Sequence, residues 1–285
     1  MKHHEPLAAH SADSAYPPSP RRSLGQNFLV NPNVIRAIAD AAAPDETTLT
    51  VELGVGRGAL SRELCQRTTR VTGIEKDLKL LEWAAENSIY PSNLDIIAAD
   101  MLDVDFAALA ADHGKKLNVI GNLPYNISSQ IVVMLVDNRH VLDRATLMFQ
   151  KEVAERLVAM PGGRQYGVLS VQAGYCFEIR KVMDVSPGQF RPRPKVMSTV
   201  LSFIPKTPVL ALHDFDLFRK IVRSAFLNRR KKMLNSMKKN MDIRENLLRH
   251  AMDETGIPLD ARAETVDVDT FVRLTNFLKK EGINP

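Results

Sequence analysis

The stretch "VELGVGRGALS" (residues 51–61) places a β-branched strand, a glycine-rich turn and a helix start in direct succession. Glycine accepts positive φ angles and close backbone approach, and a helix N-terminus offers unpaired amide donors. Read as G-x-G-x-x-G/A with Ala59 last, the turn fits a dinucleotide-binding fingerprint. We therefore expect a cofactor to bind at Gly54 and Gly56.

The sequence on both sides of this turn alternates between strand and helix patterns. Expected strands are 48–54, 70–77, 94–100, 117–122, 144–150 and 198–205, and expected helices include 31–42, 59–67 and 77–87. Residues 167–185 are typical of one or two further strands. This alternation predicts an α/β fold with a doubly wound, mostly parallel sheet.

Changes in composition and in hydrophobic periodicity divide the chain into three parts. Residues 1–20 are rich in Pro, Ser and Ala, which predicts a disordered tail. Residues 21–207 carry the strand–helix alternation and form the expected cofactor-binding domain. From residue 208 onward only helical periodicity remains, so we expect a small all-helical domain over 208–285.

Composition excludes several classes of protein. The 285 residues are 45% hydrophobic and 25% charged, with a net charge of +5, as in ordinary globular proteins. No apolar run reaches the ~20 residues of a membrane span. The cysteines, Cys65 and Cys176, form no CxxC motif, which argues against a zinc ribbon or a disulfide framework. We expect a cytoplasmic protein with no metal and no membrane partner.

The polar residues after successive strands narrow the choice of cofactor. Glu75 ends the second strand, where a ribose diol needs a two-oxygen acceptor. The glycine turn and Glu75 alone fit either a nicotinamide or flavin dinucleotide or S-adenosylmethionine. Glu52 places a carboxylate near a positively charged cofactor, and Asp100 is positioned either to accept from an adenine amino group or to cap a helix. Glu52, Asp100 and the polar segment after the fourth strand, described next, together favour S-adenosylmethionine over a dinucleotide.

The fourth expected strand ends in "GNLPY" (121–125). This is an unfavourable strand end, because Pro124 cannot donate a backbone hydrogen bond. Adenine N6 is a weak nucleophile, and it reacts better when two acceptors hold its hydrogens. The Asn122 side-chain carbonyl and the Leu123 backbone carbonyl offer such a pair. Tyr125 offers a ring for stacking a flipped base. The alternative is a proline-containing turn with an Asn cap and a packed Tyr.

These motifs together resemble the ribosomal RNA adenine N6,N6-dimethyltransferases, relatives of the erythromycin-resistance methylases. The resemblance covers nearly all of residues 22–285 and includes "LGQNFLVNPNVIRAI" (24–38), "VELGVGRGALS" (51–61), "GNLPYNISSQI" (121–131), "FRPRPKVMSTVL" (190–201) and "AFLNRRKKMLNSM" (225–237). It implies a Rossmann-like class I methyltransferase fold with a seven-stranded sheet, S-adenosyl-L-methionine as methyl donor and S-adenosyl-L-homocysteine as product.

The resemblance also implies roles for individual residues. Asn27 and Leu29 would contact the cofactor, Gly54 its methionine part, Glu75 its ribose and Asp100 its adenine. Asn122 would line the methyl-transfer centre. The target adenine would stack between Tyr125 and Phe190, a residue that otherwise reads as an ordinary loop hydrophobe.

A cationic run between residues 219 and 239 predicts RNA binding, because it contains no acidic residue. The candidate contacts are Arg223, Arg229, Arg230, Lys231 and Lys232, on a helix anchored by Phe226, Leu227, Met233 and Leu234. The alternative is a solvated helix face.

The resemblance is greatest to the housekeeping small-subunit enzymes, so the expected reaction transfers four methyl groups to two adjacent adenosines in the 3′-terminal hairpin loop of 16S rRNA. The partner would be an immature 30S subunit, in ribosome biogenesis, and the protein would be a monomer. Three alternatives stay open: a 23S rRNA adenine methylase conferring macrolide resistance, a dinucleotide-dependent oxidoreductase and a non-catalytic assembly factor.

Overall fold

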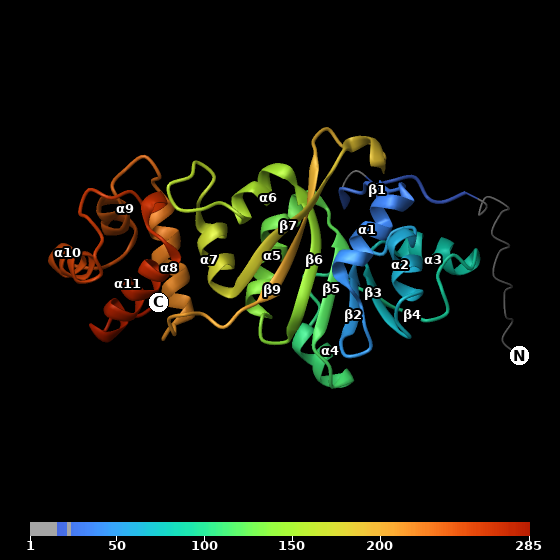
Figure 1. Ribbon diagram of the computed structural model, residues 1–285, viewed down its shortest axis with the longest axis horizontal. Helices are drawn as coiled ribbons and strands as arrows, with labels where there is room; N and C mark the ends of the chain where they lie inside the picture. Colours follow the sequence, from blue (N-terminus) through green and yellow to red (C-terminus); the bar gives the residue numbers. More distant parts are fainter. Residues whose placement is uncertain (1–15, 22–23) are drawn as a thin grey trace, which may run out of the picture.

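The glycine turn follows an inner strand of a seven-stranded sheet in a computed structural model that describes residues 16–21 and 24–285 (Figure 1). The strands are β1 (Phe28–Leu29), β2 (Leu49–Leu53), β3 (Val71–Glu75), β4 (Leu94–Ala98), β5 (Leu117–Asn122), β6 (Leu142–Gln150), β7 (Phe177–Val185), β8 (Phe190–Arg191) and β9 (Ser198–Pro205). The sheet order is β4-β3-β2-β5-β6-β9-β7. Pairs from β4 to β6 are parallel, and β9 pairs antiparallel with β6 and β7. The predicted doubly wound, mostly parallel fold is confirmed.

The helices connect these strands and then continue alone to the C-terminus. They are α1 (Pro32–Ala42), α2 (Ala59–Cys65), α3 (Leu78–Glu86), α4 (Phe106–His113), α5 (Ser128–Asp137), α6 (Lys151–Leu157), α7 (Val168–Cys176), α8 (Phe215–Phe226), α9 (Met233–Asn240), α10 (Glu245–Glu254) and α11 (Val268–Lys280). In α1, the Asn31 side chain caps the helix by accepting from the Asn33 N–H at 2.8 Å.

Side-chain alternation along the strands divides the core between the two faces of the sheet. On β6, Leu147 and Phe149 pack on one face and Met148 on the other. Helices α1 and α2 contribute to the core on the Met148 face. Helices α4, α5 and α7 contribute on the opposite face. Because both faces are covered, β2 and β3 are buried throughout, including the polar side chains of Glu52 and Glu75 near their carboxyl ends.

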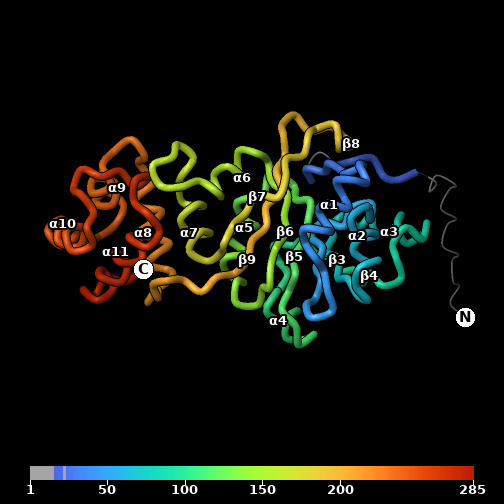
Figure 2. Tube along the Cα trace, in the orientation of Figure 1, coloured from blue at the N-terminus to red at the C-terminus, as the bar shows by residue number. Residues whose placement is uncertain are grey.

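The C-terminal segment is helical, as predicted, and it shares a hydrophobic core with the sheet's α5–α7 side. Helix α8 packs against α7, and the ring of Phe215 lies between the guanidinium groups of Arg139 and Arg219, 4.5 and 4.8 Å away. Figure 2 shows α8–α11 gathered at one end of the long axis. The domain boundary at residue 208 stays a prediction.

The expected strand pattern over 167–185 is wrong in its first half, where helix α7 precedes strand β7. Helix α7 packs against α5, α6, α8 and α11 and is buried around most of its circumference. A helix buried on several sides has no polar stripe, so its sequence shows no helical periodicity.

The predicted tail, residues 1–20, lies mostly outside the described residues. Of its described part, the Pro18 carbonyl accepts a hydrogen bond from the Arg57 guanidinium at 3.0 Å. Residues 24–27 lead into β1 (labelled in Figure 1), which pairs antiparallel with β8 (labelled in Figure 2).

Candidate active site

The glycine turn between β2 and α2 has a backbone that requires glycine. Gly54 and Gly56 have φ angles of 75° and 57°, in the left-handed region. A Cβ atom on Gly56 would lie 3.1 Å from the Phe28 ring, and the Arg57 guanidinium lies over the same ring, 4.6 Å from its centroid. The turn therefore passes close to the N-terminal segment with no room for a side chain.

Glu75, at the end of β3, organises this turn. Its Oε2 accepts from the Gly56 N–H at 3.0 Å, and its Oε1 accepts from the N–H groups of Lys76 and Asp77, each at 3.0 Å. The Tyr90 hydroxyl donates to the Gly56 carbonyl at 2.7 Å. Both polar backbone groups of Gly56 are thus held by side chains from other elements, which fixes the turn before any ligand binds.

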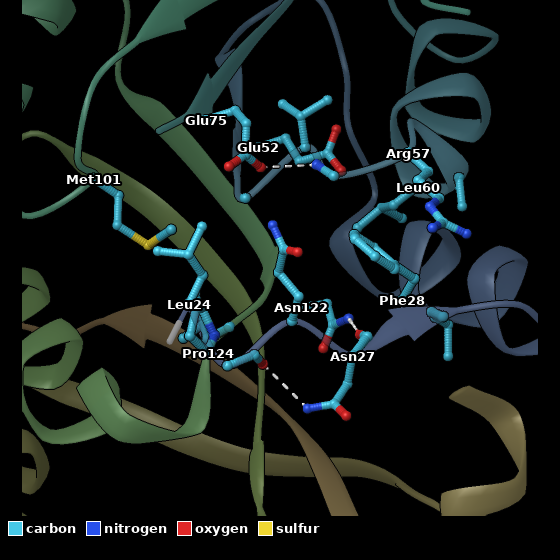
Figure 3. Close-up of a pocket in the computed structure, with 18 of the residues that line it drawn as sticks. Leu24, Asn27, Phe28, Glu52, Arg57, Leu60, Glu75, Met101, Asn122 and Pro124 are labelled. Carbon is cyan, nitrogen blue, oxygen red and sulfur yellow. Dashed lines mark hydrogen bonds between the residues drawn. The ribbon is translucent and has the colours of Figure 1, made fainter. Parts of the chain in front are cut away.

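A pocket opens beside the turn, between the N-terminal segment and the carboxyl ends of β2, β3 and β5 (Figure 3). The predicted cofactor residues that line it are Asn27, Leu29, Gly54, Gly56, Glu75 and Asn122. Leu123 and Pro124 contribute to the same wall. The carboxyl edge of an open α/β sheet is where such folds bind ligands, so the pocket has the location that the sequence predicts.

Asp100 does not line this pocket. Its Oδ2 accepts from Lys76 Nζ at 2.9 Å and its Oδ1 accepts from the Leu102 N–H at 3.1 Å. Partial burial opposes ionisation, but these hydrogen bonds outweigh it and lower the pKa of Asp100. Lys76 lines the pocket and was not among the predicted residues, because a lysine after a strand has no distinguishing pattern.

Glu52 lines the pocket with a carboxyl group that is 2% exposed. Burial, reinforced by the nearby charge of Glu75, raises its pKa to about 8. Its Oε2 is buried with no hydrogen-bond partner in the described part of the chain. A buried acceptor with no partner is costly, so a cationic ligand group in this pocket would meet a favourable site.

The 122–125 segment leaves β5 and forms a tight turn into α5. The Asn122 amide donates through Nδ2 to the Asn27 carbonyl at 2.8 Å, and among the described residues no donor bonds to its Oδ1. The Tyr125 hydroxyl and the Ser198 hydroxyl share a hydrogen bond at 2.7 Å. Tyr125 is half-buried at the base of β9 and does not line the pocket, and this burial raises its pKa.

Phe190 lies differently from its predicted role. It pairs with Leu29 across the β1–β8 ribbon and is fully buried among Leu29, Met148 and Val200. The predicted stacking on a base is not possible in this arrangement, because the ring has no exposed face. Here Phe190 anchors the N-terminal segment, a role that its position in a loop did not indicate.

The cationic run also departs from the single helix that we expected. Helix α8 ends at Phe226 and α9 begins at Met233, so Arg229, Arg230, Lys231 and Lys232 lie in the turn between them. Leu227 is 67% exposed and anchors nothing. Arg223, on α8, and all four cations of the turn are exposed.

Arg229 is engaged within the fold, unlike its neighbours. Its Nη2 donates to the carbonyls of Arg164 and Tyr166, at 2.8 and 2.9 Å, and lies 3.7 Å from Glu264. Arg229 therefore ties the turn to the α6–α7 connection. Among the described residues, Arg223, Arg230, Lys231 and Lys232 have no ion pair and remain available to phosphates.

In residues 16–21 and 24–285, no group of three or more His, Cys, Asp or Glu side chains is placed to hold a metal ion. Across the same ranges, no helix has the length and apolarity to cross a membrane.

The chain is similar to known proteins over most of its length. Residues 19–280 match the family Ribosomal RNA adenine dimethylase. The chain is 35% identical over 273 residues to the Ribosomal RNA small subunit methyltransferase A of Desulfotalea psychrophila, covering 92% of each protein. The protein of the same name from Desulforapulum autotrophicum is 40% identical over 265 residues, with 90% of this chain and 92% of that protein covered.

Two solved structures share the fold over nearly the whole chain. A dimethyladenosine transferase from Plasmodium falciparum superimposes with a TM-score of 0.74 at 25% identity, covering 90% of this chain and 98% of that one. The 23S rRNA methyltransferase ErmE superimposes with a TM-score of 0.66 at 26% identity, covering 89% and 100%.

Proposed function

The chain belongs to the ribosomal RNA adenine dimethylase family, and on this premise we propose that it dimethylates N6 of two adjacent adenosines in the 3′-terminal hairpin loop of 16S rRNA. S-adenosyl-L-methionine is the methyl donor and S-adenosyl-L-homocysteine the product. The substrate is the immature 30S subunit, in ribosome biogenesis. The protein acts as a cytoplasmic monomer without a metal.

One observation carries this proposal: Asn122 lines the cofactor pocket at the end of β5 and presents an unbonded side-chain carbonyl there. A nicotinamide enzyme has no use for an Asn-Leu-Pro-Tyr turn at this point. An amine methylase needs it, because the amino group must be held by acceptors while its lone pair turns toward the methyl group.

The pocket residues fit the proposed cofactor, which supplies a methyl group on a positively charged sulfur. The unpartnered Oε2 of Glu52 offers an acceptor to a cationic group. The Glu75 carboxylate lies at the pocket wall, and its Oε2, which accepts a single N–H, keeps a lone pair for a ribose hydroxyl. The glycine turn lets the ligand approach the backbone at Gly54 and Gly56.

Methyl transfer then depends on orientation. The Asn122 Oδ1 and the Leu123 carbonyl accept the two N6 hydrogens, so that the nitrogen lone pair points at the methyl carbon. The carbon–nitrogen bond forms as the carbon–sulfur bond breaks, and one N6 proton leaves to solvent. No general base is needed, because a sulfonium is an activated donor; positioning and electrostatics supply the acceleration.

Asp100 and the aromatic pair complete the proposed site. The Lys76-bound carboxylate of Asp100 keeps lone pairs for the adenine amino group of the cofactor. Tyr125 presents its half-buried ring to the target base, and its hydroxyl stays on Ser198. A Phe190 contribution to stacking would require the β1–β8 ribbon to shift, so Tyr125 alone is the proposed platform.

Substrate choice follows from the relatives. The 23S rRNA methylase alternative rests on the structural likeness to ErmE at 26% identity. The small-subunit enzymes reach 40% identity over nearly their whole length, and this favours 16S rRNA. The exposed cations of the α8–α9 turn suit contacts to RNA phosphates.

Primer extension on both ribosomal RNAs after incubation with the protein tests this choice. We expect stops at two adjacent adenosines near the 3′ end of 16S rRNA, and none in 23S rRNA. A stop confined to 23S rRNA would overturn the proposed substrate in favour of the resistance methylases.

A further inference from the structure

Asp77 follows Glu75 by two residues and stands immediately before helix α3, where an aspartate ordinarily caps the helix. Here the Asp77 side chain makes no cap hydrogen bond. It is 2% exposed and turns toward the N-terminal segment. Burying a carboxylate costs folding free energy unless other groups bond to it. Since Asp77 does not cap the helix, its partners on the N-terminal segment must stabilise it.

Those contacts come from two residues of the N-terminal segment. Asp77 Oδ2 accepts from Gln26 Nε2 at 2.8 Å, and Asp77 Oδ1 lies 3.3 Å from Arg21 Nη1. The Gln26 side chain also bonds back to its own segment, since its Oε1 accepts from the Arg21 N–H at 2.8 Å. Arg21 and Gln26 are thereby joined to each other and to the same carboxylate.

The fastened segment forms one wall of the cofactor pocket. Residues 24–29 line it, including the predicted cofactor contacts Asn27 and Leu29 (Figure 3). Beyond Asp77, the segment is attached by the two-residue pairing of β1 with β8 and by the Asn27 carbonyl on Asn122. Asp77 attaches the segment two residues beyond Glu75, and Asn122 attaches it at the end of β5.

We propose that Asp77 is a positioning residue, which through Arg21 and Gln26 fastens residues 24–29 over the pocket and so holds Asn27 and Leu29 against the cofactor. Its backbone N–H donates to Glu75 Oε1, so the ribose acceptor and the fastening point share one short loop. The inference deepens the proposed function and rests on S-adenosylmethionine as the ligand. Loss of the fastening weakens cofactor binding and leaves the methyl-transfer geometry at Asn122 in place.

The test compares Asp77→Asn, which keeps the shape of the side chain and removes its charge, with Gln26→Met from the other side of the contact. Asp95→Asn serves as the matched control. Asp95 lies on β4, forms an exposed ion pair with Arg70 and does not line the pocket. Calorimetry gives the dissociation constant for S-adenosylmethionine, and steady-state assays give KM and kcat separately.

We expect Asp77→Asn and Gln26→Met each to raise the dissociation constant and KM about tenfold, the effect of losing one charge-assisted hydrogen bond. The double variant should raise the dissociation constant by less than the product of the two single effects, because both substitutions act on the Gln26–Asp77 hydrogen bond. The kcat value at saturating cofactor and the RNA affinity should stay within twofold, and Asp95→Asn should match the wild type.

Dissociation constants within twofold of the wild type in both single variants would overturn the inference. So would an equal fall in kcat, RNA affinity and melting temperature, which would indicate a merely structural role. A wild-type protein that binds no S-adenosylmethionine would instead overturn the proposed function, and this outcome is visible in the same calorimetry before any variant is compared.

Discussion

The side-chain amide of Asn122 donates to the backbone carbonyl of Asn27, 2.8 Å away and 95 positions earlier in the chain. This hydrogen bond joins the end of the central strand β5 to the N-terminal segment that lines the pocket. It also fixes the orientation of the amide, since Nδ2 is used and Oδ1 is left facing no donor among the described residues. The proposed methyl-transfer centre is thus oriented by the same segment that covers the cofactor.

Replacing Asn122 with Ala removes the proposed acceptor for N6. We expect kcat to fall by about 10²–10³, the usual cost of losing one preorganised electrostatic contact in a transition state. RNA affinity should be unchanged, as measured by filter binding. Asn126→Ala is the control, because Asn126 is an exposed asparagine in the same stretch. Undiminished dimethylation by Asn122→Ala would remove the proposed role.

Glu75→Gln tests whether the glycine turn and the ribose site depend on one carboxylate. Glutamine has one acceptor oxygen, so it cannot accept from both Gly56 and the Lys76–Asp77 amides. Calorimetry should show cofactor affinity lowered by about tenfold or more. Glu82→Gln, an exposed position on α3, should bind as the wild type does; a similar loss there would show that the effect is not specific to the site.

The raised pKa of Glu52 predicts a pH-dependent stability. Between its ordinary value of 4.5 and about 8, the unfolded chain has lost the proton that the folded chain keeps. The stabilising contribution of this proton is full below pH 4.5 and falls as the pH rises toward 8. Glu52→Gln should therefore gain stability relative to the wild type between pH 5 and pH 8, as measured by urea unfolding. If Glu52→Gln and the wild type differed in unfolding free energy by the same amount at pH 5 and at pH 8, the raised pKa of Glu52 would be contradicted.

The same group predicts proton release on binding. A cationic cofactor favours the ionised form of Glu52, so binding at pH 7 should release a proton that the free protein holds. Calorimetry in buffers of different ionisation enthalpy measures this release. Glu52→Gln should abolish it, and a wild-type enthalpy that is independent of the buffer would speak against Glu52 as the acceptor.

The cations of the α8–α9 turn should divide into two functional kinds. Arg230→Gln and Lys231→Gln should each weaken rRNA binding and reduce the salt dependence, the slope of log K against log salt, by about 1. Arg229→Gln should mainly lower the melting temperature, because Arg229 holds two backbone carbonyls. If Arg229→Gln instead weakened RNA binding while Arg230→Gln and Lys231→Gln left it unchanged, Arg229 would be the RNA contact.

Features with a local chemical signature were predictable from the sequence. The positive φ angles of Gly54 and Gly56 and the position of Glu75 follow from the strand–turn–helix pattern, because few residue types satisfy that backbone. The parallel sheet follows from the alternation of strands and helices. These signals depend on residues near one another in the chain.

Features that depend on distant contacts were not predictable. Helix α7 resembled a strand because burial on several sides hides its period. Phe190 resembled a loop residue because its partner, Leu29, lies far away in the sequence. Arg229 resembled its cationic neighbours until its carbonyl partners were known.

The measurement that tests the central claim most directly is the transfer of labelled methyl groups from S-adenosylmethionine to purified 30S and 50S particles that lack this modification. Asn122→Ala serves as the inactive control. The account predicts about four methyl groups per 30S particle, all recovered as N6,N6-dimethyladenosine, and none on 50S particles. Label on 50S particles alone, or no label on either with a protein that still binds 30S particles, would contradict it.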